Sequence, residues 1–280
     1  MKTRIITAVV ALCILLPVLL LSDTVLLPIM LAICSAVGVW EMLSCIGLRK
    51  SAVLSVPLYL IALGAPFVVR YTHGMDFVRQ VTTALICFVL LYFFSVLTFS
   101  HGKYKLADVA TVFMTVLYIV IGFNSVLVLR DFETGGKYVY LTVFICSWTT
   151  DTFAYFCGML FGRGGKHKLL PDVSPKKTVE GSIGGILFCV LAMLLFGMIV
   201  DPLYPEADIH YLMLAIAGVL ASVIAQIGDL CMSVIKRTYG VKDYGKLFPG
   251  HGGVLDRFDS VLAVSVVLAT FCSFFDFFVR

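Results

Sequence analysis

Nine long apolar segments constrain the fold of this 280-residue chain more than any other feature of its sequence. Most are long enough to cross a hydrocarbon core of ~30 Å as helices. A chain that is 60% hydrophobic and 14% charged, with a mean hydropathy of +1.02, falls outside the class of soluble domains. The sequence therefore predicts an all-α integral membrane protein of about nine transmembrane helices, near residues 5–22, 25–47, 52–69, 80–100, 107–129, 138–161, 183–200, 211–235 and 254–279.

The distribution of basic residues predicts the orientation of these helices. If the N-terminus lies in the cytoplasm and the segments alternate across nine spans, few of the 21 Lys and Arg residues fall outside. This bias matches the excess of positive charge in cytoplasmic loops of membrane proteins. We therefore expect a cytoplasmic N-terminus, an external C-terminus, and only these cations outside: Arg70, Arg79, Arg130, Lys137 and Arg280.

The cysteines and the net charge bear on metal binding, disulfide formation and nucleic-acid binding. The nine cysteines all fall inside predicted spans, are odd in number and form no C-x-x-C pair, so they predict packing residues and neither disulfides nor a zinc site. The net charge of +4 suits an anionic lipid surface and gives no support for nucleic-acid binding. Glu41, inside the second apolar segment, is costly there and predicts either a helix-packing partner or the wall of a polar cavity.

The stretch from Asp229 to Asp259 concentrates charge at the end of an apolar segment. At about 100° per residue, a helix over 211–235 places Asp229, Ser233, Lys236 and Arg237 within an arc of roughly 100°. One helix face would then carry a carboxylate, a hydroxyl and two cations.

A glycine-rich loop separates that face from two further carboxylates. The run Pro249-Gly250-His251-Gly252-Gly253 offers backbone N–H groups that can approach an anion closely. Asp256 and Asp259 follow three residues apart and share a face of the next helix. Carboxylates that can hold a divalent cation, beside groups that can hold phosphates, predict a nucleotide-phosphate site.

These residues resemble the signature of the phosphatidate cytidylyltransferases, the CDP-diacylglycerol synthases of membranes. The matching elements are S-x-x-K-R from Ser233, K-D-x-G from Lys242, and P-G-H-G-G-x-x-D-R-x-D from Pro249. A D-x-x-A-Y run at Asp151 and an S-P-K-K-T-x-E-G run at Ser174 are also similar to the family. The likeness in motifs covers roughly the C-terminal half.

The runs at Asp151 and Ser174 can also be interpreted from their residues alone, without the resemblance. Asp151 lies near the middle of an apolar segment, where an aspartate costs about 2.5–3.5 kcal/mol on insertion scales, and predicts either a buried carboxyl bonded to neighbouring hydroxyls or a polar cavity floor. The Ser174 run places hydroxyls and two lysines at a turn before a glycine-rich helix start, which suits a phosphate. It is not a P-loop, so no ATPase is predicted.

The resemblance implies that CTP and phosphatidic acid give CDP-diacylglycerol and pyrophosphate. It implies Mg²⁺ held by Asp229, Asp256 and Asp259 with Ser233 nearby, with a monovalent cation such as K⁺ as a candidate companion. Asp229 and Asp256 are also implied to be catalytic, together with Lys236, Arg237, His251 and Arg257. The implied substrate-binding residues are Asp151, Ser174, Lys176, Lys177, Thr178, Glu180, Lys242, Asp243, Lys246, Gly252 and Gly253.

The same reading divides the chain into residues 1–137, about five lipid-facing or oligomerising helices, and residues 138–280, a catalytic region of about four helices with two cytoplasmic loops. We expect a homodimer in the lipid bilayer, with the active site facing the cytoplasm of a bacterial plasma (inner) membrane. Three alternatives stay open. They are a CTP-dependent enzyme on another lipid (a polyprenol kinase or a related cytidylyltransferase), a proton-coupled transporter, and an intramembrane aspartyl protease, whose G-x-G-D motif is absent at Asp229.

Overall fold

The computed structural model describes residues 2–72, 75–162, 167–171 and 173–279. Arg163, Lys166 and Arg280, which are among the 21 Lys and Arg residues of the charge distribution, lie outside these ranges. The chain forms two compact units, and each contains two separate stretches of sequence. Residues 1–127 and 241–257 make up the first unit, and residues 128–240 and 258–280 make up the second. The predicted catalytic role of residues 138–280 stays a prediction.

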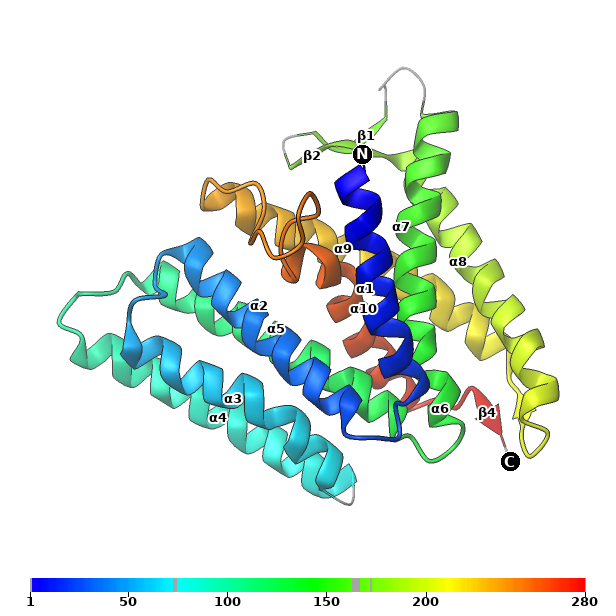
Figure 1. Cartoon of the computed structure of the whole chain (residues 1–280), viewed down its shortest axis with the longest axis horizontal. Coiled ribbons are helices and arrows are strands. Elements are labelled where there is room, and N and C mark those ends of the chain that lie inside the picture. The colour runs from blue at the N-terminus through cyan, green and yellow to red at the C-terminus, as the bar shows by residue number, and fades with distance from the viewer. Residues whose placement is uncertain (1, 73–74, 163–166, 172, 280) are drawn as a thin grey trace. The chain divides into compact units, whose positions relative to one another are not determined.

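Each predicted apolar segment contains one long helix (Figure 1). The first unit holds four complete helices, most of a fifth, and the first residues of a tenth, in the order α1 (Lys2–Leu20), α2 (Leu26–Ile46), α3 (Ala52–Tyr71), α4 (Met75–Phe99), α5 (Leu106–Arg130) and α10 (Leu255–Cys272). The second unit holds the rest of α10 together with α6 (Gly136–Val139), α7 (Leu141–Phe161), β1 (Lys168–Leu170), β2 (Ser174–Thr178), α8 (Val179–Val200), the 3-10 turn Asp201–Leu203, β3 (Asp208–Ile209), α9 (Tyr211–Thr238) and β4 (Phe278–Val279).

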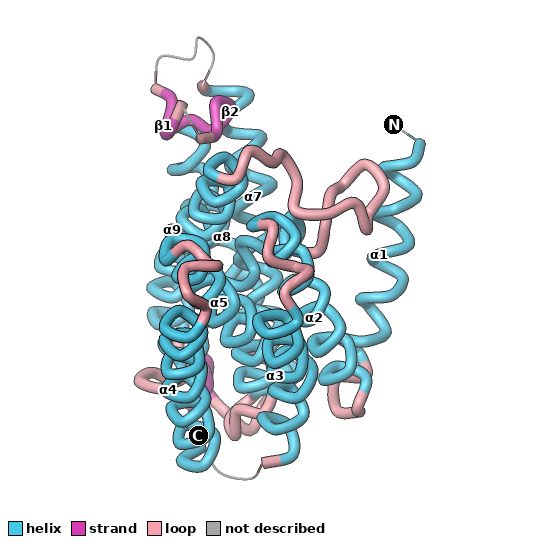
Figure 2. The backbone as a smooth tube through the Cα atoms, turned by 90° about the vertical axis from the view of Figure 1, so that its left-hand side faces the viewer, coloured by secondary structure: helices cyan, strands magenta, loops and turns pink. Residues whose placement is uncertain are grey.

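In the first unit, α2 packs along α3, and α3 packs along α4 (Figure 2). The buried face of α3 carries Leu54, Leu58 and Ala62, whose spacing of four residues follows the turn of a helix. Val56 and Leu60 on the same helix stay more than half exposed. Exposing such an apolar face to water would be unfavourable, whereas contact with lipid chains would not be.

In the second unit, α8 packs closely against both α7 and α9. Its glycines make this possible, because a Cβ at Gly184 would collide with the side chain of Cys157 in α7. On the α9 side, Gly197 leaves room for the side chain of Leu214. Small residues at helix contacts allow such close approach in membrane proteins. The outward face of α8 is apolar and exposed, at Ile183, Leu187, Leu191, Leu195 and Met198.

In the part of the chain that the structure describes, two short antiparallel pairs of strands interrupt the helical architecture. β1 pairs with β2, so the turn predicted over Ser174–Thr178 is wrong, and this segment is a strand that leads directly into α8. β3 pairs with β4, so the last apolar segment is helical only as far as Cys272 and then turns back as a strand. The strands are two to five residues long, too short to show the alternating pattern by which strands are recognised in a sequence.

Among the described residues, six helices are long and apolar enough to cross a membrane by length and composition: α2, α3, residues 82–99 of α4, α5, α8 extended to Leu203, and α9. The architecture is that of an all-α membrane protein. The full count of nine spans and the side on which each terminus lies stay predictions.

Candidate active site

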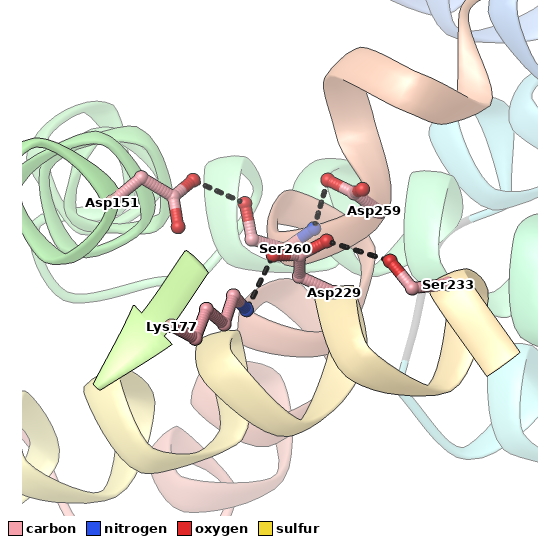
Figure 3. Close-up of polar contacts among 6 residues, drawn as sticks. All are labelled: Asp151, Lys177, Asp229, Ser233, Asp259 and Ser260. Carbon is pink, nitrogen blue, oxygen red and sulfur yellow. Dashed lines mark hydrogen bonds and ion pairs between the residues drawn. The ribbon is translucent and has the colours of Figure 1, made fainter. Parts of the chain in front are cut away.

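Three carboxylates of the second unit gather around Ser260, and they come from three different helices (Figure 3). The Ser260 hydroxyl donates to Asp151 Oδ2 in α7 over 3.0 Å, and the Ser260 backbone N–H donates to Asp259 Oδ1 over 2.9 Å. In α9, Asp229 Oδ1 accepts from the Ser233 hydroxyl at 3.4 Å. Asp229, Ser233 and Asp259 therefore lie together, and Asp151 joins them through Ser260, a residue that the sequence analysis missed.

In the structure, Lys177 forms an ion pair with Asp229 of this cluster. Its Nζ lies 2.5 Å from Asp229 Oδ2, and each side chain is 27% exposed. Successive residues of a strand point to opposite faces, so Lys176 in β2 points away from this contact and is exposed. The strand explains why two adjacent lysines, predicted as a pair, have different surroundings.

Thr178 and Glu180 stabilise the start of α8. The Thr178 hydroxyl accepts from the Gly181 backbone N–H at 3.1 Å, which is the usual bond of a helix N-cap. Glu180, in the first turn, pairs with His167 Nδ1 at 2.7 Å. These contacts account for both residues structurally. Their binding of substrate, like that of Ser174 at the start of β2, stays a prediction.

Lys236 and Arg237 follow the carboxylate cluster along α9. The Lys236 side chain is buried, and its positive charge acts on the Asp259 carboxyl. Arg237 is exposed at the end of the helix. The two cations predicted on one face of α9 therefore have different surroundings, and the inner one interacts with a carboxylate of the same unit.

The first unit contains a cavity of about 650 Å³. Its walls carry three cations and one carboxylate among polar and glycine backbone, so the cavity favours an anion. Most of the predicted loop residues meet here, since its lining consists of Lys242, Asp243, Gly245, Lys246, Phe248, Pro249, Gly250, His251, Gly252 and Arg257.

A tight turn shapes one wall of this cavity. The Phe248 N–H donates to the Gly252 carbonyl at 2.9 Å, and the His251 N–H donates to the Phe248 carbonyl at 2.8 Å. Gly250 and Gly252 have φ of 79° and 85°, a region that side chains other than glycine rarely adopt. His251 Nδ1 is buried and, within the described part of the chain, has no hydrogen-bond partner. A ligand in the cavity would give it one.

Asp256 anchors the same loop from the start of α10. The residue is buried, and its Oδ2 accepts backbone N–H groups from Tyr244 at 2.8 Å and from Gly253 at 2.9 Å. Asp256 therefore has a structural task in the first unit in addition to the metal-binding role that the sequence predicts for it.

Glu41 shares this task, and its role could not be recognised in the sequence. Its two oxygens accept the backbone N–H groups of Val254 and Leu255, 213 and 214 residues away. Of the two predicted roles, the packing partner is the one observed, although the partner is a backbone and not a side chain. Only the presence of a charge in an apolar segment signalled the residue.

The chemistry of the carboxylate cluster fits a hard divalent cation. Carboxylate and hydroxyl oxygens are the donors that Mg²⁺ prefers, and the Lys177 ammonium already stands beside Asp229 as a cation. Among the described residues, however, no three His, Cys, Asp or Glu side chains are placed as a ready group of metal ligands. The ligand set predicted from the sequence stays a prediction.

Comparison with known proteins finds one family across nearly the whole chain. A sequence model of the cytidylyltransferase family matches residues 2–275. A phosphatidate cytidylyltransferase of Staphylococcus haemolyticus (strain JCSC1435) is 33% identical over 268 residues, and one of Staphylococcus saprophyticus is 34% identical over 268. One of Staphylococcus aureus (strain COL) is 35% identical over 272 residues. Each alignment covers 96% of this chain and 97% of the relative.

Proposed function

The chain belongs to the cytidylyltransferase family, and on this premise we propose that it transfers CMP from CTP to phosphatidic acid. The products are CDP-diacylglycerol and pyrophosphate. The observation that carries the proposal is that an otherwise apolar chain contains a carboxylate cluster and a cationic cavity lined by glycine backbone. Relatives of similar length are named for this activity, which supports the same substrates.

In the proposed reaction, an oxygen of the lipid phosphate forms a bond to the α-phosphorus of CTP. The bond from that phosphorus to the oxygen bridging the α- and β-phosphates breaks, and pyrophosphate leaves with the electron pair. The lipid phosphate is already an anion near neutral pH, so no strong general base is needed. The protein has to align two anions that repel each other and stabilise the charge on the leaving group.

The residues of the cavity bind phosphate in this proposal. Lys242, Lys246 and Arg257 offset negative charge, and the Nδ1 of His251 donates a hydrogen bond to a phosphate oxygen. The glycines of the turn let backbone approach the ligand closely. The acyl chains stay in the bilayer beside the exposed apolar faces.

Asp229 and Asp259, with Ser233 close by, would hold Mg²⁺ in the second unit, and the sequence adds Asp256 to this set. When bound, Mg²⁺ supplies positive charge to phosphate oxygens. Lys177, which now neutralises Asp229, would then be released to bind a phosphate. Asp151 accepts a hydrogen bond from the Ser260 hydroxyl and adds a third carboxylate to the cluster.

We further propose that the protein lies in a bacterial plasma membrane with its N-terminus and its charged loops in the cytoplasm. The bacterial relatives and the bias of Lys and Arg towards one side support this orientation. The homodimer stays an expectation from the family resemblance.

Purified protein tests the proposed donor specificity. Detergent-solubilised protein would receive phosphatidic acid, Mg²⁺ and, in separate reactions, CTP, ATP, GTP or UTP, and pyrophosphate release would be followed. We expect release with CTP alone, and only in the presence of Mg²⁺. Release of a nucleoside diphosphate would indicate a lipid kinase. No turnover with any nucleotide by folded protein would favour the proton-coupled transporter.

A further inference from the structure

Glu41 of α2 is completely buried, and both oxygens of its carboxylate contact the start of α10 within the first unit. Oε1 accepts the Val254 N–H and Oε2 accepts the Leu255 N–H, each at 2.9 Å. A carboxylate at this position satisfies two of the N–H groups that a helix leaves unpaired at its N-terminus and interacts favourably with the helix dipole. A buried charge of this kind is retained only where such partners exist.

Two glycines leave room for this carboxylate. A Cβ at Gly245 or at Gly253 would collide with the Glu41 carboxylate, so neither position accepts a larger residue without displacing it. Gly253 adopts no positive φ, which means that backbone conformation does not explain the glycine there. The close approach of the Glu41 carboxylate explains why this position is a glycine.

Glu41 and Asp256 hold the two ends of the cavity loop. Asp256 accepts N–H groups from Tyr244 and Gly253, and Glu41 accepts those of the next two residues, Val254 and Leu255. Between these anchors lies the turn from Phe248 to Gly252 that carries His251. Four backbone bonds to two buried carboxylates therefore set the position of the wall of the cavity.

We propose that Glu41 is a positioning residue for nucleotide binding: it sets the loop so that the cations and His251 of the cavity meet the triphosphate. This inference rests on the proposed function. Glu41 is fully buried and is not among the residues that line the cavity. Its loss would misplace the phosphate-binding groups, and the binding of CTP would weaken more than the rate of the chemical step changes.

Glu41→Gln is the sharpest variant because it keeps the size of the side chain. Glutamine has one acceptor oxygen, so its NH₂ group would face one of the two backbone N–H groups and that bond would be lost. We expect the KM for CTP to rise about tenfold with kcat changed less than threefold, as small misplacements of binding groups produce. Ser35→Ala, also buried in α2, is the matched control and should leave both constants unchanged.

If Glu41→Gln fails to fold, two other variants, Gly253→Ala and Glu41→Asp, test the same contact. Gly253→Ala pushes a methyl group into the carboxylate and should raise the KM for CTP. Glu41→Asp withdraws the carboxylate by one methylene and should recover part of that loss in the double variant. Independent effects of the two changes, or a neutral Gly253→Ala, would overturn the positioning role.

Hydrogen exchange separates this inference from the proposed function. In Glu41→Gln, exchange of the Val254 and Leu255 amides should accelerate while that of α3 stays as in the parent protein. If the parent shows no CTP-dependent turnover, the proposed function fails. If the parent turns over CTP and Glu41→Gln keeps its KM and its amide protection, the positioning role fails and the proposed function stands.

Discussion

At the scale of single residues, charged groups that are neighbours in the sequence have different contacts in the structure. Lys176 and Lys177 are neighbours in β2, yet among the described residues Lys177 pairs with a carboxylate and Lys176 is exposed. Asp256 and Asp259 both follow the glycine-rich loop. Asp256 accepts two backbone N–H groups of that loop, whereas Asp259 lies with Asp229 and Asp151 in the second unit. Substitutions can therefore distinguish residues that act on the ligand from residues that hold the fold.

Asp256→Asn should abolish turnover and leave membrane insertion and folding intact. The amide oxygen of asparagine can still accept the N–H groups of Tyr244 and Gly253, so the loop keeps its anchor, but the negative charge needed for a metal is lost. Turnover with phosphatidic acid and CTP, beside elution from a sizing column, checks this. Near-normal activity would remove Asp256 from the metal site and leave it with the structural task alone.

Lys177→Ala should raise the KM for CTP or for phosphatidic acid about tenfold or more, because a cation beside the carboxylate cluster is lost. Lys176→Ala, on the exposed face of the same strand, should have a several-fold smaller effect. Steady-state kinetics on both variants and the parent measure the difference. Equal effects would mean that the strand contributes only its general charge at the lipid surface.

At the scale of elements, the helices are predictable and the strands are not. Apolar runs of about twenty residues identify helices, and the spacing of Asp229 and Ser233 along one such run placed them correctly on one face. The strands β1 to β4 are two to five residues long and carry no such pattern. The role of Glu41 depends on an approach between residues more than 200 positions apart, which no local pattern encodes.

The glycine face of α8 makes a prediction about stability. Gly184→Ala should destabilise the protein by about 1–3 kcal/mol, because the added methyl group meets Cys157 in a close-packed contact. Gly64→Ala, in α3 with open space around it, is the matched control and should be neutral or slightly stabilising. Thermal unfolding in detergent compares the two. Adding Cys157→Ala to Gly184→Ala should restore part of the loss, and purely additive losses would contradict the contact.

At the scale of the whole molecule, the sequence predicts the class of protein and the family, but not how the chain divides into compact units. Residues 241–257 belong to the first unit although they follow the second in sequence. Residues 128–240 separate them in the sequence from residues 1–127, with which they group. The functional boundary predicted after residue 137 stays a prediction. Composition and hydropathy report how much of a chain is buried in lipid. They do not report which distant segments pack together.

The predicted orientation can be tested with single cysteines. In a variant without native cysteines, Lys103→Cys should react with a membrane-impermeant maleimide in inverted membrane vesicles and not in right-side-out vesicles. Lys137→Cys should show the opposite pattern. These expectations follow from the bias of Lys and Arg towards the cytoplasm. The same pattern at both positions would contradict the predicted alternation of spans.

The central claim is CMP transfer to a lipid phosphate, and the fate of labelled CTP tests it most directly. With phosphatidic acid and Mg²⁺, CTP labelled at the α-phosphate should place its label in the lipid product, and CTP labelled at the γ-phosphate should place its label in pyrophosphate. Label from the γ-phosphate in the lipid would make the protein a kinase. Folded protein that leaves both labels in CTP would contradict the proposed activity altogether.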